Sequence, residues 1–129
     1  MLNNEDTLAI HNLLNLYHYY VDEPGFPRVR EIFTEDCIFD SSDFGGPVTH
    51  GIAELEKRFS RDSGVLVHTC SNIILTEDPD GTIRSVSKCV AMIPDGKVGA
   101  AIHADVLRRT ADGWRIAKRV ISKPPRLKG

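Results

Sequence analysis

The sequence predicts an α+β domain in which three N-terminal helices pack on a curved, mostly antiparallel sheet that encloses a pocket. Helical periodicity is confined to the part of the chain before residue 60. From residue 65 onward, runs of β-branched and apolar residues are separated by short turn sequences instead. Helices that come first and strands that come afterwards are typical of an α+β fold, whereas a parallel α/β fold would alternate the two.

An apolar stripe at helical spacing marks the first helix, and it consists of Ile10, Leu13, Leu14, Tyr17 and Val21. Asn3 or Asn4 can cap the start of this helix, and Pro24-Gly25 ends it. A second, short helix is expected to begin at Pro27, because proline is favoured at the first helical position.

The later elements follow from the same kind of pattern. The second helix would turn Val29, Ile32 and Phe33 inward. A strand is expected over residues 37–40, and a third helical stripe is formed by Ile52, Leu55 and Phe59. Four strands are then expected over residues 65–76, 83–93, 98–109 and 114–122, joined by three tight turns into an antiparallel meander. A sheet of this kind leaves a cavity between itself and the first helix.

Length and composition indicate one globular domain over residues 1–123, followed by a flexible basic tail over residues 124–129. The apolar fraction of 41% and the charged fraction of 26% are ordinary for a globular protein. A net charge of −2 argues against a nucleic-acid-binding protein, which usually carries a basic face. No secretory signal and no apolar run of ~20 residues is visible. We therefore expect a cytoplasmic protein that has no membrane or nucleic-acid partner.

Metal and disulfide chemistry have little support in the sequence. The three cysteines are widely spaced and form no CxxC pair, so free thiols are expected rather than a disulfide framework or a zinc knuckle. The five histidines show no HxH, HExxH or facial-triad spacing. We expect neither a metal site nor a cofactor.

Asp22 and His68 are the two candidate catalytic residues. Asp22 falls at the end of the first expected helix, where the helix dipole disfavours a carboxylate by up to ~1 kcal/mol, so it is either functional or an exposed turn residue. His68 shares one face of its strand with Cys70 and Asn72, which predicts either a lined cavity or a solvent-facing strip. His18 lies four residues before Asp22 and could pair with it on the helix surface instead.

Several segments, in their order and spacing, resemble the SnoaL-like group of the nuclear transport factor 2-like superfamily. These segments are residues 9–22 (AIHNLLNLYHYYVD), 32–40 (IFTEDCIFD), 50–59 (HGIAELEKRF), 68–75 (HTCSNIIL) and 107–119 (LRRTADGWRIAKR). The resemblance extends from about residue 6 to residue 121. It implies a cone-shaped α+β barrel with an internal pocket.

Within this group, scytalone dehydratase and hexachlorocyclohexane dehydrochlorinase are similar in arrangement. Both pair an aspartate at the end of the first helix with a histidine on the following long strand, and Asp22 and His68 match those positions. Arg119 matches an arginine that the dehydrochlorinase uses for its leaving group, and Tyr17 replaces a lysine of that enzyme. The strand over residues 85–93 lacks the second catalytic histidine of scytalone dehydratase.

The resemblance implies a cofactor-independent dehydratase, isomerase or cyclase that acts on a small hydrophobic molecule through an Asp22–His68 dyad. The expected substrate-binding residues are Tyr17, Tyr20, Cys70, His103 and Arg119. Of these, Tyr17, Tyr20 or His103 would polarise an oxygen of the substrate.

The sequence leaves two other functions open. The first is a non-catalytic small-molecule-binding or dimerisation module, with a homodimer formed through the sheet around Val106 and Ile116. The second is a polyketide-type cyclase in which Asp105 or His103 is the base. His103 lies among apolar residues in AAIHADVL, a setting in which a lone histidine is more often structural.

Overall fold

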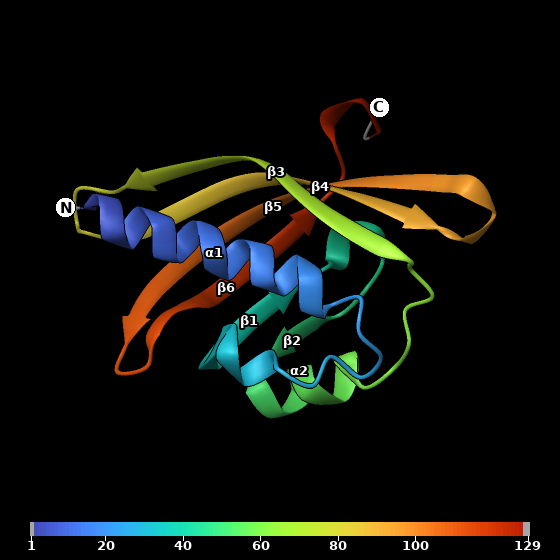
Figure 1. Cartoon of the computed structure of the whole chain (residues 1–129), viewed down its shortest axis with the longest axis horizontal. Helices are drawn as coiled ribbons and strands as arrows, with labels where there is room; N and C mark the ends of the chain where they lie inside the picture. Colours follow the sequence, from blue (N-terminus) through green and yellow to red (C-terminus); the bar gives the residue numbers. More distant parts are fainter. Residues whose placement is uncertain (1, 128–129) are drawn as a thin grey trace.

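The computed structural model describes residues 2–127 and confirms the α+β class. Its two α-helices are α1 (Asn4–Tyr20) and α2 (Ile52–Phe59). Its strands are β1 (Phe33–Asp40), β2 (Val48–His50), β3 (Val67–Glu77), β4 (Ile83–Ile93), β5 (Lys97–Thr110) and β6 (Gly113–Ser122). The strands form one sheet in the order β2-β1-β6-β5-β4-β3. Only the pairing of β1 with β6 is parallel among these strands (Figure 1).

The expected second helix, the one beginning at Pro27, is wrong. In its place the chain makes a single 3-10 turn over Val29–Glu31. The carbonyl of Ile32 already accepts a hydrogen bond from the amide of Ile116 at 2.8 Å, and Phe33 lies opposite Ile116 in the sheet. Strand β1 therefore begins at Phe33 rather than at residue 37, and this early pairing with β6 leaves no length for a helix.

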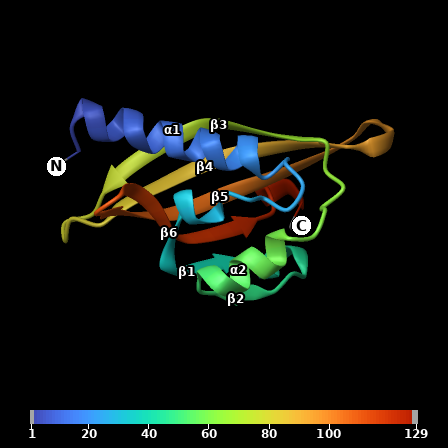
Figure 2. The ribbon, with the colours of Figure 1, turned by 60° about the horizontal axis from the view of Figure 1, so that its bottom comes forward.

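The expectation of a closed barrel is also wrong, because the sheet is open. Its two edges are β2 and β3, and across the described residues these edge strands do not pair with each other. Strand β2 is only three residues long, and α2 lies beside β1 and β2 rather than over the middle of the sheet (Figure 2). The pocket is therefore bounded by the sheet on one side and by α1 and the loops on the other.

Helix α1 covers one face of the sheet and fixes the position of the pocket. It begins behind the cap residue Asn3, whose side chain accepts a hydrogen bond from the amide of Asp6 at 2.8 Å. Ile10 and Leu14 on its inner face are fully buried. The helix ends at Tyr20, earlier than the Pro24-Gly25 expectation, so Asp22 lies in the turn that follows it.

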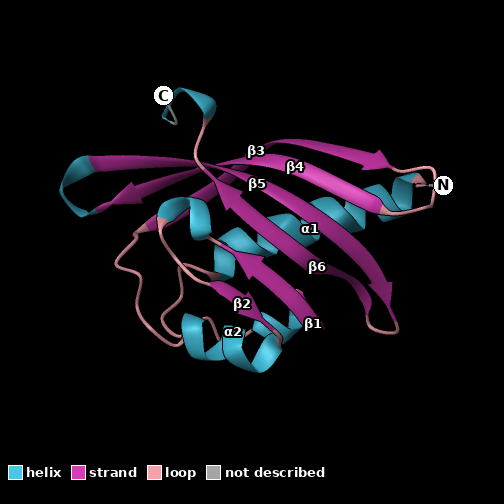
Figure 3. Cartoon of the chain, turned by 180° about the vertical axis from the view of Figure 1, so that it is seen from behind, coloured by secondary structure: helices cyan, strands magenta, loops and turns pink. Residues whose placement is uncertain are grey.

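The other face of the sheet carries no helix in the described part of the chain (Figure 3). Apolar side chains of β4 and β5 are exposed there, among them Val86, Val90, Met92 and Val98. Val106 is partly exposed, but Ile116 is fully buried in the core. The placement of Ile116 in a dimer interface is therefore wrong, because a register shift in β6 turns its side chain inward.

A bulge in β3 changes which residues face the pocket. The register between β3 and β4 shifts between Ser71 and Ile74, and Asn72 has a positive φ of 55°. Before the bulge His68 and Cys70 face inward, and after it Ile73 does. Asn72 is exposed, so the expectation that it shares a cavity-lining face with His68 and Cys70 is wrong.

The C-terminal tail follows strand β6. The described part of the tail, residues 124–127, contains a 3-10 turn over Pro125–Leu127, and residues 128–129 of the expected tail lie outside the described residues. Among the described helices, none combines the length and apolar character needed to span a bilayer.

Candidate functional site

The side chains of Asp22 and His68 meet where the turn after α1 crosses the start of β3. Nδ1 of His68 lies 2.6 Å from Oδ1 of Asp22, and the backbone amide of His68 donates to both carboxylate oxygens at 3.1 Å. Both side chains remain partly accessible, at 18% for His68 and 19% for Asp22. With Nδ1 as the donor to the carboxylate, Nε2 is left as the ring nitrogen with an open lone pair.

His68 borders three neighbouring cavities. One of about 270 Å³ lies over the inner face of the sheet, against Tyr17, Cys89, His103 and Ile121. A second, of about 180 Å³, lies on the Asp22 side, and a third of about 450 Å³ opens outward between α1 and β3. A small ligand in the inner space would lie beside the His68 ring, and the outer groove gives it access.

Behind the inner cavity, Asp105 and Arg119 form a fully buried ion pair. Asp105 lies directly opposite both Ser85 on β4 and Arg119 on β6. Its carboxylate accepts hydrogen bonds from Nε and Nη2 of Arg119 at 2.7 and 2.8 Å and from the Ser85 hydroxyl at 3.1 Å. Burial alone would lower the pKa of Arg119, but the adjacent carboxylate raises it above its usual value. This geometry occupies the Asp105 oxygens and disfavours Asp105 as a base.

Tyr17 separates this ion pair from the cavity. The Arg119 guanidinium lies 4.2 Å from the centre of the Tyr17 ring, which is a cation–π contact. Burial raises the pKa of the Tyr17 phenol to about 12, despite the opposing charge of Arg119. Tyr17 therefore borders the cavity as a neutral phenol, with the Arg119 guanidinium packed against its ring.

Two buried histidines lie beside the same cavity. His18 on α1 and His103 on β5 stack at 5.1 Å between ring centres, and each is 3% exposed. Nδ1 of His18 lies 2.7 Å from the carbonyl of Leu14 and does not pair with Asp22. Burial, followed by the Arg119 charge, lowers the pKa of His18 to about 4 and lowers that of His103 well below its usual value. Both rings are thus neutral at physiological pH.

The remaining expected binding residues lie in different places. Cys70 lines the outer groove, and burial raises the pKa of its thiol. Tyr20 lies outside the three cavities around His68; its hydroxyl accepts a hydrogen bond from Arg28, whose guanidinium also lies over its ring. The structure therefore brings Asp22, His68 and Cys70 to the groove and leaves Tyr20 outside it.

The sequence reasoning missed the inward-facing pair of His18 and Cys89. His18 lies four residues after Leu14, so it falls on the buried stripe of α1. Cys89 follows Ser85 and Ser87 at alternate positions on the inner face of β4. Helical and strand periodicity therefore contained the signal that places both residues on inward faces.

Comparisons with known proteins place the chain in a family. The chain matches the family model of the SnoaL-like domain over residues 3–120. A comparison with curated proteins gives no match.

Solved structures show the same fold. An NTF2-like protein with a cystatin-like fold from Novosphingobium aromaticivorans has a TM-score of 0.77 at 21% identity, covering 94% of this chain and 83% of that one. ActVI-ORFA from Streptomyces coelicolor has a TM-score of 0.71 at 23% identity, covering 90% of this chain and 95% of that one. A protein described as a candidate scytalone dehydratase from N. aromaticivorans has a TM-score of 0.69 at 17% identity, covering 92% of this chain and 87% of that one. At such identities the likeness shows the fold alone.

Proposed function

This chain belongs to the SnoaL-like domain family, and from that premise we propose that it is an acid–base enzyme in which His68 is the base and Asp22 orients it. The observation that carries the proposal is the 2.6 Å contact between Nδ1 of His68 and Oδ1 of Asp22 beside a cavity. A carboxylate at one ring nitrogen fixes the tautomer and raises the basicity of the other. A base placed in this way typically contributes ~10²–10⁴-fold to a rate.

The reaction class is removal of a proton next to a carbonyl or a leaving group, which includes dehydration, isomerisation and cyclisation. His68 would take the proton at Nε2 and return it at another atom of the same molecule, so the reaction needs no cofactor. Tyr17 and His103 border the same cavity, and the neutral Tyr17 phenol is a hydrogen-bond donor for a substrate oxygen. The candidate scytalone dehydratase among the structural neighbours supports this class of reaction by analogy.

The substrate would be a small hydrophobic molecule with one polar oxygen. Ala91, Ala101 and Ile121 give the inner cavity an apolar wall, and Tyr17 and His103 add polar atoms at one side. A cavity of about 270 Å³ suits a molecule near the small end of the ligand range.

Deuterium exchange tests this proposal without knowledge of the natural substrate. A panel of cyclic and bicyclic aryl ketones in D2O is followed by proton NMR for enzyme-dependent loss of the α-proton signals. His68→Ala should abolish the exchange and leave the melting temperature nearly unchanged, because the backbone amide of residue 68 still binds Asp22. His50→Ala, a change at an exposed histidine on β2, should leave the exchange intact. Exchange that survives His68→Ala, or no exchange with any ketone, would count against the proposal.

A non-catalytic dimerisation module is the second candidate, and the exposed sheet face favours it. Val86, Val90, Met92 and Val98 are 43–65% exposed on this face. Clustered apolar side chains of this kind are typical of interaction surfaces, so we propose a homodimer formed through the β4–β5 face. Analytical ultracentrifugation should then find a dimer that Val90→Glu converts to a monomer. A monomeric parent protein would exclude this interface.

A further inference from the structure

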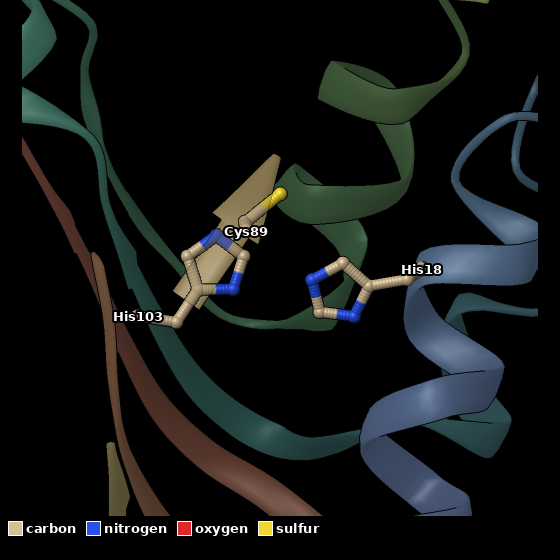
Figure 4. Close-up of side chains that lie close together, drawn as sticks. All are labelled: His18, Cys89 and His103. Atoms are coloured by element: carbon tan, nitrogen blue, oxygen red, sulfur yellow. The ribbon is translucent and has the colours of Figure 1, made fainter. Parts of the chain in front are cut away.

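We propose that His18, Cys89 and His103 form a binding site for a soft divalent cation such as Zn²⁺, with its remaining coordination position facing the inner cavity. One ligand atom from each of the three residues lies within 4.8 Å of the other two. Figure 4 shows the two imidazoles facing each other from α1 and β5, with the Cys89 sulfur beside the space between them. The three residues come from three different elements, which is why no spacing motif in the sequence marks them.

Unpartnered nitrogen atoms are the second observation. Nε2 of His18 and Nδ1 of His103 are buried and have no hydrogen-bond partner among the described residues. Buried polar atoms nearly always have a partner, so two such atoms facing each other call for a ligand that joins them. A metal ion accepts lone pairs from both nitrogens at once.

The tautomer of His18 suits this role. Its Nδ1 lies 2.7 Å from the carbonyl of Leu14 and serves as the donor, which leaves the lone pair on Nε2. Metal-binding histidines typically donate a hydrogen bond from their other ring nitrogen to a backbone carbonyl or carboxylate in this way. The ring is therefore already oriented for coordination.

The donor set and its dimensions select the metal. Two imidazoles and one thiolate suit Zn²⁺ and similar soft ions rather than Mg²⁺ or Ca²⁺. Tetrahedral zinc keeps its ligand atoms about 3.4–3.7 Å apart. Because the ligand atoms of the cluster lie within 4.8 Å of one another, the widest separation has to shorten by about 1 Å when the ion binds. Binding would release the Cys89 thiol proton to solvent and leave a Zn–S bond in its place.

Charge and access are compatible with a cation. Arg119, whose charge lowers the pKa of both histidines, is paired with both oxygens of Asp105. Cys89 and His103 border the inner cavity, and His18 borders the outer groove, so an ion can reach the cluster from two sides. The cluster contains neither Asp22 nor His68, so its test does not depend on the proposed acid–base function.

Cobalt substitution tests this site on the intact chain after treatment with a chelator. Co²⁺ should bind one equivalent and give a thiolate-to-cobalt charge-transfer band together with strong tetrahedral d–d bands. Zn²⁺ added in competition should remove both. A spectrum without the thiolate band would overturn the proposal, and this measurement requires no variant.

A pair of matched variants assigns the thiol. Cys89→Ala should abolish the charge-transfer band and weaken Co²⁺ binding by more than about 100-fold. Loss of a residue that only supports a metal ligand costs up to about 100-fold in affinity, and loss of the ligand itself should cost more. Cys37→Ala removes an equally buried thiol on β1 and should keep both the band and the affinity. Circular dichroism checks that each variant is folded. Equal binding by Cys89→Ala and the parent chain would overturn the proposal.

Discussion

Two contacts between a carboxylate and a nitrogen-bearing side chain, one at each side of the pocket, have nearly equal lengths but very different surroundings. Asp22 and His68 lie 2.6 Å apart and are 19% and 18% exposed. Asp105 and Arg119 lie 2.7 Å apart, and both side chains are fully buried. Water and ligands can reach the first pair, so it can exchange protons with them. The second pair holds fixed charges behind Tyr17 and fixes the shape of the cavity wall.

Removal of one partner from the buried pair should have the largest effect on stability. Asp105→Ala leaves the Arg119 guanidinium buried without a counter-charge, and we expect a loss of about 3–5 kcal/mol in the free energy of unfolding. Urea unfolding followed by circular dichroism measures it.

The matched control is Asp78→Ala, which breaks the surface pair with Arg84. That change should cost less than about 1 kcal/mol, because the pair lies at the surface, with Arg84 52% and Asp78 34% exposed. If Asp105→Ala cost no more than this control, the buried pair would not stabilise the fold.

The buried histidines should make stability depend on pH. The pKa of His18 is lowered to about 4 in the folded chain, so between pH 6.5 and pH 4 the unfolded chain binds a proton that the folded chain does not. The free energy of unfolding should therefore fall as the pH falls, by about 3 kcal/mol from His18 across this window.

His18→Asn removes this titration and keeps a donor for the carbonyl of Leu14. In metal-free buffer, urea midpoints at pH 7, 5.5 and 4.5 should fall less steeply for His18→Asn than for the parent chain. Parallel curves for the two proteins would show that His18 is not held neutral by its surroundings.

Tyr17 lies between the two pairs, and its substitutions should have the smallest effects. Tyr17→Phe keeps the aromatic ring over Arg119 and should change stability by less than about 1 kcal/mol, the scale of one hydrogen bond. Tyr17→Leu loses the cation–π contact and should cost about 2 kcal/mol more than the phenylalanine variant. Thermal unfolding compares the two, and equal losses would argue against the contact with Arg119.

The sequence was a good guide to the elements that follow simple periodicity. The strands predicted over residues 83–93 and 114–122 agree with β4 and β6 to within a residue, because turn sequences bound them on both sides. The second helix failed because pairing between Phe33 and Ile116, which are 83 residues apart, overrides the local preference of Pro27. Local sequence contains no information about that distant partner.

The site was harder to predict because two bulges set its register. An uninterrupted hairpin with Thr110 opposite Gly113 would place Asp105 opposite Lys118, but the shift between Val106 and Leu107 places it opposite Arg119. Without this one-residue shift in register, Asp105 would not lie opposite Arg119. The bulge at Asn72 likewise decides which half of β3 lines the pocket.

The contact between Asp22 and His68 was suggested by resemblance rather than by pattern. Their side chains do meet, while their catalytic role, the absence of a required cofactor and the cytoplasmic location remain predictions. Nothing in the local sequence shows that a turn after α1 reaches the start of β3.

A double-mutant cycle on the exchange reaction tests the central claim, that Asp22 and His68 act as one acid–base unit. The rates of deuterium exchange are compared for the parent chain, Asp22→Asn, His68→Ala and the double variant. If Asp22 acts through His68, the double variant should lose no more activity than His68→Ala alone. Losses that multiply in the double variant would show that the two residues act independently, and would contradict the account.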